Sequence, residues 1–404
     1  MTAPPAEDRL GDAAVALTAE LVAVDSVNPG LVPGAAGEAG IVEMLGRRLE
    51  RRGFRTEVVP ASGPGDRPSL LASAGAGDGP RLVLNGHLDT VGVGGMADPF
   101  TPRLEGDLRT GRLYGRGACD MKGGVAGLVV AAEEVASTGV AGEVLLALVA
   151  DEEDASLGTE AVLAHLLATD RRPDACLVGE PTWLDLVVAH RGFAVMEVVL
   201  RGVAAHTSRP EAGVDAIAHL GRLLGAVARH DEVVAARPPH PLVGTGSLLA
   251  SVVSGGEAPF TLAGSARAVL ERRTLPGESA DDALAEVHVL LVELGREDPL
   301  FDPELSLLLA REPWEAGRDA AGSGLADALA ASLVAAGRDE PVRRGAPYWM
   351  DSALWGRAGV PTVVCGPAGE GLHAAEEWVE LAQLRAYAVA VADLVRTFCG
   401  VPAG

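Results

Sequence analysis

The chain has 404 residues, 48% of them hydrophobic and 22% charged; this length favours two domains, and the composition is ordinary for a soluble globular protein. A formal net charge of -23 argues against a nucleic acid or an anionic membrane as partner. The start of the chain has no signal-peptide pattern, no apolar run is as long as a membrane span, and the four cysteines form no CxxC pair, so we expect a cytoplasmic protein with reduced thiols.

The first 183 residues alternate between helical periodicity and short apolar runs. Helices are expected at residues 12–24, 123–136 and 157–167, and strands at residues 81–85, 143–150 and 175–179. Alternation of this kind predicts an α/β fold in which helices cover both faces of a sheet.

The order of the expected elements then changes to βαββαβ. Strands are expected at residues 193–201, 247–254, 262–272 and 305–311, with helices at 214–229 and 281–294. This is the order of the ferredoxin-like split βαβ unit. The α/β pattern resumes with a helix at 323–336, a strand at 361–366 and a final helix at 381–398. We therefore expect one domain in two parts, residues 1–187 and 316–404, interrupted by an inserted α+β domain at 188–315.

Polar residues follow the strands expected in the first domain. His87 and Asp89 follow the first, the run of acids at 151–153 the second, and Glu180 the third, while His373 comes shortly after the last strand. Each residue alone is ambiguous, because such side chains also pack, cap helices or face solvent. Sites in open α/β sheets form beyond the carboxyl ends of the strands. Two histidines and three carboxylates, one of them Asp120, form the ligand set that a pair of divalent ions needs.

Seven sequence blocks resemble, in order, those of a known family. This family comprises di-zinc amidohydrolases and exopeptidases such as acetylornithine deacetylase, succinyl-diaminopimelate desuccinylase, aminoacylase and glutamate carboxypeptidase. The blocks are GHLDTV (86–91), YGRGACDMKGG (114–124), DEE (151–153), GEPT (179–182), RGVAAHTSRPEAGVDA (201–216), ERRTLPGE (271–278) and GLHAAEEWVEL (371–381). The resemblance covers essentially the whole chain. It implies a zinc-exopeptidase-like catalytic domain with helices on both faces of a mixed sheet, and makes the inserted α+β domain a dimerisation, or lid, domain.

The resemblance also implies two zinc ions per subunit. Asp120 would bridge them, His87 and Glu180 would complete one site, and Glu153 and His373 the other. Cobalt or manganese could replace zinc, since carboxylate and imidazole ligands accept all three.

The catalytic residues follow from the same matches. Asp89 would accept the second ring N–H of His87 and fix its tautomer. Glu152 would be the general base that takes a proton from a zinc-bound water and delivers it to the leaving amine. The reverse assignment, with Glu153 as base and Glu152 as ligand, stays open. In the family the peptide bond after Asp120 is cis.

Two residues of the inserted domain match substrate-binding positions. His206 would reach the active site of the partner subunit and hydrogen-bond the developing oxyanion, which implies a homodimer. Arg273 would bind the α-carboxylate of the substrate. Arg272 competes with it, because adjacent side chains of a strand point to opposite faces.

The chain departs from the family pattern at two places. Residues 258–264 read APFTLAG where many members have a segment that supplies an amide contact, so this contact is expected to be missing. MDSA at 350–353 replaces Thr-Asp-Ala, with Asp351 retained. Tyr348, Trp349 and Met350 either reshape a substrate pocket or belong to the core.

The resemblance implies an enzyme that hydrolyses the amide bond of a small N-acyl amino acid, like acetylornithine deacetylase. A zinc carboxypeptidase or dipeptidase that cleaves a peptide bond is the alternative, since the zinc chemistry is the same. A binding protein without activity is a third reading, which the presence of all five ligands and Glu152 disfavours. The acyl group and the amino acid cannot be read from these motifs.

Overall fold

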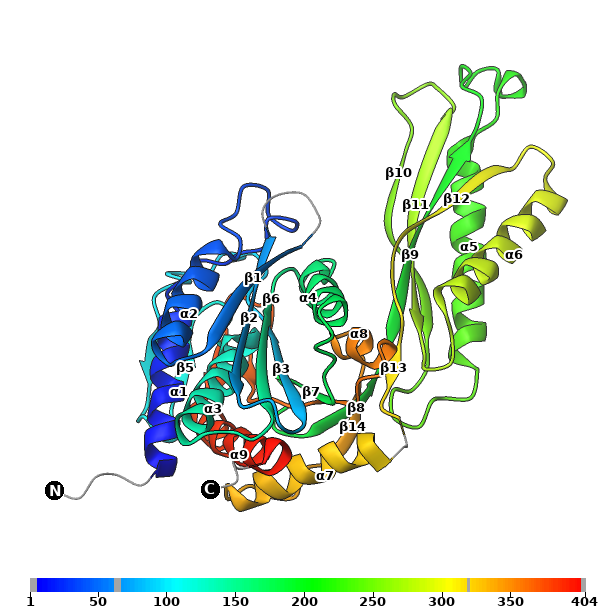
Figure 1. Ribbon diagram of the computed structural model, residues 1–404. Coiled ribbons are helices and arrows are strands. Elements are labelled where there is room, and N and C mark those ends of the chain that lie inside the picture. Colours follow the sequence, from blue (N-terminus) through cyan, green and yellow to red (C-terminus); the bar gives the residue numbers. More distant parts are fainter. Residues whose placement is uncertain (1–5, 62–66, 318–319, 401–404) are drawn as a thin grey trace. The chain divides into compact units, whose positions relative to one another are not determined.

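The computed structural model describes residues 6–61, 67–317 and 320–400 (Figure 1). The chain forms two compact units. The first comprises Met1–Val188, Ala316–Arg344 and Met350–Gly404, and the second comprises Ala189–Glu315 and Gly345–Trp349. The first unit is thus assembled from segments that lie on both sides of the second in the sequence.

A mixed sheet forms the centre of the first unit. In the described residues its strands follow the order β1 (Arg55–Ala61), β2 (Arg67–Gly75), β6 (Glu143–Val149), β3 (Arg81–His87), β7 (Ala175–Val178), β15 (Thr362–Val364) and β8 (Leu186–His190). β3 is parallel to β6 and β7, whereas β1 and β2 pair antiparallel. β14 (Arg343–Ala346) also pairs with β8, and β13 (Trp314–Glu315) pairs with the last two residues of β8. β6 and β7 are buried along their whole length, as parallel strands covered on both faces are.

Helices cover this sheet on both faces, which confirms the predicted fold class. They are α1 (Ala6–Val22), α2 (Ala39–Arg51), α3 (Gly123–Thr138), α4 (Leu157–Ala168), α7 (Ala320–Ala335), α8 (Ser352–Arg357) and α9 (Leu381–Cys399). α1, α2, α3, α7 and α9 share one hydrophobic core with the sheet. α4 contacts β1, β2 and β6 from the other face (Figure 1).

A small separate sheet joins two segments that are far apart in the sequence. Its order is β4 (Arg103–Glu105), β5 (Arg112–Tyr114), β17 (Trp378–Glu380) and β16 (Gly369–Glu370). Soon after β5 the chain forms the kinked turn η1 (Ala118–Lys122), in which Asp120 and Met121 have non-helical backbone angles, and this turn leads into α3. The Asp120–Met121 peptide bond in this turn is cis, as the family resemblance implies.

The second unit has the predicted βαββαβ order. Its elements are β9 (Gly192–Arg201), the short 3-10 turn η2 (Pro210–Ala212), α5 (Ala216–Ala235), β10 (Ser247–Gly255), β11 (Ser265–Thr274), α6 (Ala280–Glu297) and β12 (Asp302–Arg311). The sheet order is β10-β11-β9-β12, with antiparallel pairing throughout. β9 alternates between buried and half-buried residues, and its buried side chains form a core with α5 and α6.

None of the helices in the described part of the chain combines the length and hydropathy that a membrane span requires. The four cysteines are buried and form no disulfide, as their spacing predicts.

Candidate metal centre

The residues predicted to bind metal follow strands of the mixed sheet. His87 is the last residue of β3, Glu153 follows β6, and Glu180 follows β7. β6 and β7 flank β3 in parallel, and His87 lies opposite Val149 at the end of β6. The carboxyl ends of parallel strands meet at one edge of a sheet, so these side chains converge there.

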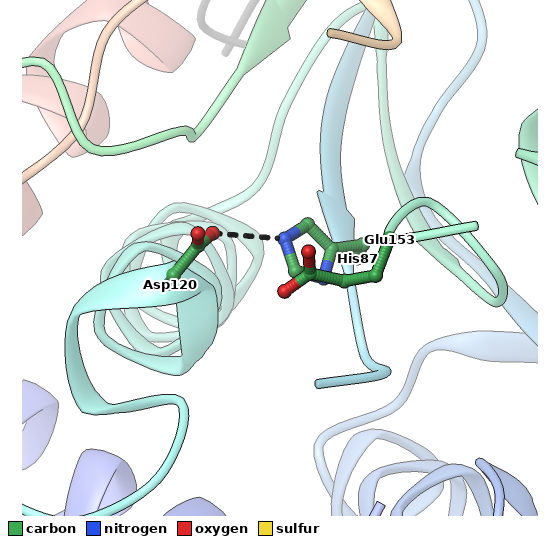
Figure 2. Close-up of side chains that lie close together, drawn as sticks. All are labelled: His87, Asp120 and Glu153. Carbon is green, nitrogen blue, oxygen red and sulfur yellow. Dashed lines mark hydrogen bonds and ion pairs between the residues drawn. The ribbon is translucent and has the colours of Figure 1, made fainter. Parts of the chain in front are cut away.

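Figure 2 shows that His87, Asp120 and Glu153 face one another. His87 Nε2 lies 3.1 Å from Asp120 Oδ1, and one potential ligand atom from each of the three residues lies within 4.8 Å of the others. A second group of the same kind consists of His87, Glu152 and Glu180. Within this group, His87 Nε2 and Glu180 Oε1 are 3.7 Å apart.

His373 completes the cluster. Its Nε2 lies 3.0 Å from Glu153 Oε2 and 3.4 Å from Asp120 Oδ2. The two carboxylate oxygens of Asp120 therefore face different histidines, Oδ1 toward His87 and Oδ2 toward His373. The structure thus brings the five predicted ligands together, with Asp120 between the two histidines.

The cluster has more acidic than basic groups. Burial and the negative charge of Glu180 raise the pKa of Glu152 well above its ordinary value. Hydrogen bonds to Asp120 and Glu153 raise the pKa of His373 to about 10. Both shifts have the direction expected where negative charge is in excess, and bound cations stabilise carboxylates that are gathered in this way.

Glu153 provides a direct test of whether the site suits metal. Its Oε1 is buried and has no hydrogen-bond partner among the described residues. Buried polar atoms are seldom unpaired, so this oxygen is free to bind a cation. Carboxylate and imidazole donors suit zinc, and also cobalt or manganese. The residues present therefore fit a pair of divalent ions.

Asp89 contacts His87 through its backbone oxygen and, at a longer distance, through its carboxylate. His87 Nδ1 lies 3.0 Å from the backbone oxygen of Asp89 but 3.6 Å from its carboxylate oxygen Oδ1. The carboxylate also accepts the backbone N–H groups of Glu152 and Glu153, at 3.1 and 3.2 Å, and the amide of Asn28, at 2.7 Å. Two of these three donors lie in the loop after β6. Asp89 therefore contacts His87 and, through its carboxylate, holds the loop of Glu152.

A buried polar network extends this arrangement and was missed by the sequence analysis. The Asn28 amide also donates to Asp151, at 3.2 Å, and Arg67 contacts the same oxygen of Asp151 at 2.7 Å. Arg67 donates in turn to Glu38, at 3.0 Å. All of these side chains are at most 3% exposed. A lone arginine in the apolar run at 67–75 was the one available signal.

The two competing arginines of the second unit differ in burial and in their partners. The side chain of Arg272 is only 2% exposed and pairs with Glu278 and Glu286, which makes it part of a buried ion network. The side chain of Arg273 is 31% exposed and donates to Glu271 at 2.6 Å. Burial and the charge of Arg273 lower the pKa of Arg191, so two guanidinium groups lie near each other.

His206 is exposed in the second unit, in a loop between β9 and α5. Its Nδ1 accepts the backbone N–H of Ser208 at 3.1 Å. The Ser208 Oγ also lies 2.7 Å from Nδ1; with both groups donating to Nδ1, the neutral ring carries its proton on Nε2. Nε2–H is then free to donate to an oxyanion.

The residues at 348–351, where the chain departs from the family pattern, differ in their burial and contacts. Met350 is 1% exposed, which favours the core reading for this residue, whereas Tyr348 is 39% exposed. Trp349 packs edge-on against His190, with ring centroids 6.1 Å apart. Asp351 is buried, which raises its pKa to about 6.

A mixed-sheet α/β unit with a carboxylate and histidine cluster at its strand ends, together with an antiparallel βαββαβ unit, defines a class of two-domain metallohydrolases. A sequence model of peptidase family M20/M25/M40 matches residues 83–397, and the chain belongs to this family. It is therefore a metal-dependent hydrolase of amide or peptide bonds.

Named relatives cover nearly the whole chain. It is 31% identical over 389 residues to a succinyl-diaminopimelate desuccinylase from Bordetella petrii. This alignment covers 92% of this chain and 94% of that protein. It is 29% identical to an acetylornithine deacetylase from Myxococcus xanthus, over 94% of this chain and 96% of that protein.

Solved structures share the fold at low sequence identity. An M20 family metallo-carboxypeptidase from Sulfolobus solfataricus superposes with a TM-score of 0.78 at 15% identity, over 95% of this chain and 99% of that one. A dinuclear metal binding peptidase of the M20 family from Bacillus subtilis does so with a TM-score of 0.72 at 14% identity, over 97% and 99%.

Proposed function

We propose that the protein hydrolyses the amide bond of an N-acyl amino acid, as an acetylornithine deacetylase-like deacylase with two zinc ions. The finding that carries this proposal is the cluster of five ligand residues with Glu152 beside it. The two named relatives described above match nearly the whole chain, and their names refer to removal of a succinyl or an acetyl group. This favours a deacylase over a peptidase.

Asp120 would lie between two zinc ions. His87 and Glu180 would hold one, and Glu153 and His373 the other. When bound, such a pair supplies Lewis acidity toward a carbonyl oxygen and lowers the pKa of water. The partnerless Oε1 of Glu153 and the separate histidine partners of the two Asp120 oxygens support this division.

Glu152 would be the general base. Its carboxylate belongs to the group formed with His87 and Glu180, and its backbone N–H is held by Asp89. Burial raises its pKa, which suits a carboxylate that must take a proton from water and then release it to the leaving amine. The base thus lies next to the ligands without pairing with His373, unlike Glu153.

The second unit would recognise the substrate. Arg273, with Arg191 nearby, offers guanidinium donors for the α-carboxylate. The Nε2–H of His206 would donate to the developing oxyanion from the partner subunit, with residues 188–315 as the dimerisation domain. Both roles come from the family resemblance, and the exposure of the two side chains supports them.

Hydrolysis of a panel of small substrates tests the proposal. The panel contains N-acetyl, N-succinyl and N-formyl amino acids and dipeptides, and the protein is assayed as purified, after chelation, and after reconstitution with zinc. We expect metal-dependent release of an amino acid from one class of acyl compound. Cleavage of dipeptides alone would establish the peptidase instead. No cleavage by a protein that holds two metal ions would favour a binding role.

A further inference from the structure

Glu377 lies four residues after His373 in the same loop, yet it is not among the proposed metal ligands. It is 1% exposed, although both flanking segments reach the surface. A fully buried carboxylate requires donors for both of its oxygens. The donors that surround Glu377 come from the segment that carries Asp120.

Four N–H groups converge on this carboxylate, two on each oxygen. Oε2 accepts from Arg116 Nη1 at 2.7 Å and from the backbone of Gly117 at 2.9 Å. Oε1 accepts from the backbone of Cys119 at 2.9 Å and of Asp120 at 3.0 Å. The side chain of Glu377 therefore fixes the backbone of residues 116–120, including the nitrogen of Asp120 itself.

The two segments are also joined on either side of Glu377. Before it, Arg116 Nη2 donates to the backbone oxygen of Ala374 at 2.9 Å. After it, the Gly115 N–H donates to the backbone oxygen of Glu377 at 3.1 Å, and β17 pairs with β5. The loop that delivers His373 and the turn that delivers Asp120 thus form one hydrogen-bonded body.

We propose that Glu377 is a positioning residue that holds Asp120 and His373 at the separation the metal pair needs before any metal binds. This inference rests on the proposed assignment of Asp120 and His373 as ligands. A glutamine at position 377 keeps the shape of the side chain, but its NH₂ group faces N–H donors where an oxygen accepted them. A role in packing alone survives this change, whereas positioning through the acceptor oxygens does not.

The test compares Glu377→Gln with the matched control Glu376→Gln, which makes the same change at the exposed neighbouring residue. Apo proteins are titrated with Co²⁺, and we record the visible absorption of the bound ion and the dissociation constants. Loss of a residue that orients metal ligands lowers metal affinity by about 10- to 100-fold. We expect such a loss and an altered Co²⁺ spectrum for Glu377→Gln, and wild-type behaviour for Glu376→Gln.

The outcomes separate this inference from the proposed metal site. Two Co²⁺ ions bound by the wild type and by Glu377→Gln, with equal affinity and spectrum, would overturn the positioning role alone. A wild type that binds no Co²⁺ would overturn the metal site itself. Should Glu377→Gln not fold, Arg116→Lys replaces the two guanidinium donors to Glu377 and Ala374 by a single ammonium and is expected to weaken Co²⁺ binding in the same direction; unchanged binding in that variant would contradict the proposal.

Discussion

Glu152 and Glu153 are adjacent acids with different surroundings. Glu153 contacts His373 at 3.0 Å, whereas Glu152 belongs to the group with His87 and Glu180. The carboxylate of Asp89 accepts the backbone N–H of both, so it holds the backbone of the two residues. The different contacts of the two side chains are the local basis for proposing one as base and the other as ligand.

Glu152→Gln is expected to leave the metal content intact and to lower turnover by at least about 100-fold, because an amide cannot accept the proton. Metal analysis and turnover with the best substrate of the panel check this, with Asp154→Asn, an exposed residue of the same loop, as control. If instead Glu152→Gln loses metal and Glu153→Gln keeps it while losing turnover, the reverse assignment is correct.

Arg273→Ala is expected to raise KM chiefly for substrates with a free α-carboxylate, because one guanidinium donor to that group is lost. The measurement compares each substrate with its methyl ester. Arg267→Ala is a suitable control, since Arg267 lies on β11 as well and pairs with Glu197. An equal rise in KM for the esters would refute the role of Arg273.

At the scale of residues, the motif blocks located every proposed ligand, and the structure brings them together. Their supporting contacts could not be predicted. Asn28 and Arg67 lie in stretches for which no element was predicted, and Glu377 is separated from Asp120 by 257 positions. A hydrogen bond over such a distance depends on the tertiary fold, and residue spacing carries no sign of it.

At the scale of elements, most long segments were predicted, but the 13-residue helix α2 was missed, as were short or irregular strands. β9 alternates with a clear period of two, whereas β3, β6 and β7 are recognised as short apolar runs. β2 is buried throughout most of its length but contains Arg67, Ser69 and Ser73, which interrupt the apolar pattern. β4, β5, β16 and β17 have only two or three residues each, and their pairing with each other determines them.

An ion network joins α6 to β11 in the second unit. Glu286 of α6 pairs with Arg272 at 2.9 Å and with Arg237 at 2.6 Å. Burial disfavours the carboxylate, but hydrogen bonds to both arginines outweigh burial and lower the pKa of Glu286 from 4.5 to about 2. A carboxyl group with a lowered pKa in the folded state stabilises that state above its unfolded pKa, and this stabilisation is lost as the pH falls toward the folded pKa.

Glu286→Gln is therefore expected to lower the thermal unfolding midpoint near neutral pH, with a difference from wild type that shrinks as the pH falls from about 4.5 toward 2. Thermal unfolding across this range checks the prediction. Glu293→Gln, at an exposed position of the same helix, is the control and is expected to show little dependence on pH. A difference that stays constant over the whole range would contradict the assigned ion network.

At the scale of the whole molecule, the residues proposed for chemistry and for recognition are divided between two units with separate cores. The proposed metal ligands and Glu152 belong to the first unit, and His206 and Arg273 to the second. Each unit is built around its own sheet, so a substitution at His206 is expected to leave the metal cluster intact. This separation makes it possible to test whether His206 acts within its own subunit or across a dimer.

We expect His206→Ala to lose most activity while keeping its metal, because the oxyanion loses a hydrogen-bond donor. Asp120→Ala is expected to be inactive through loss of metal while retaining its own His206. When the two variants are produced together with different affinity tags, the purified mixed dimer should recover activity, since one intact metal site then receives His206 from the partner subunit. The control is a mixture of the two variants that were purified separately and have not exchanged subunits. An inactive mixed dimer would show that His206 acts within its own subunit or takes no part in the reaction.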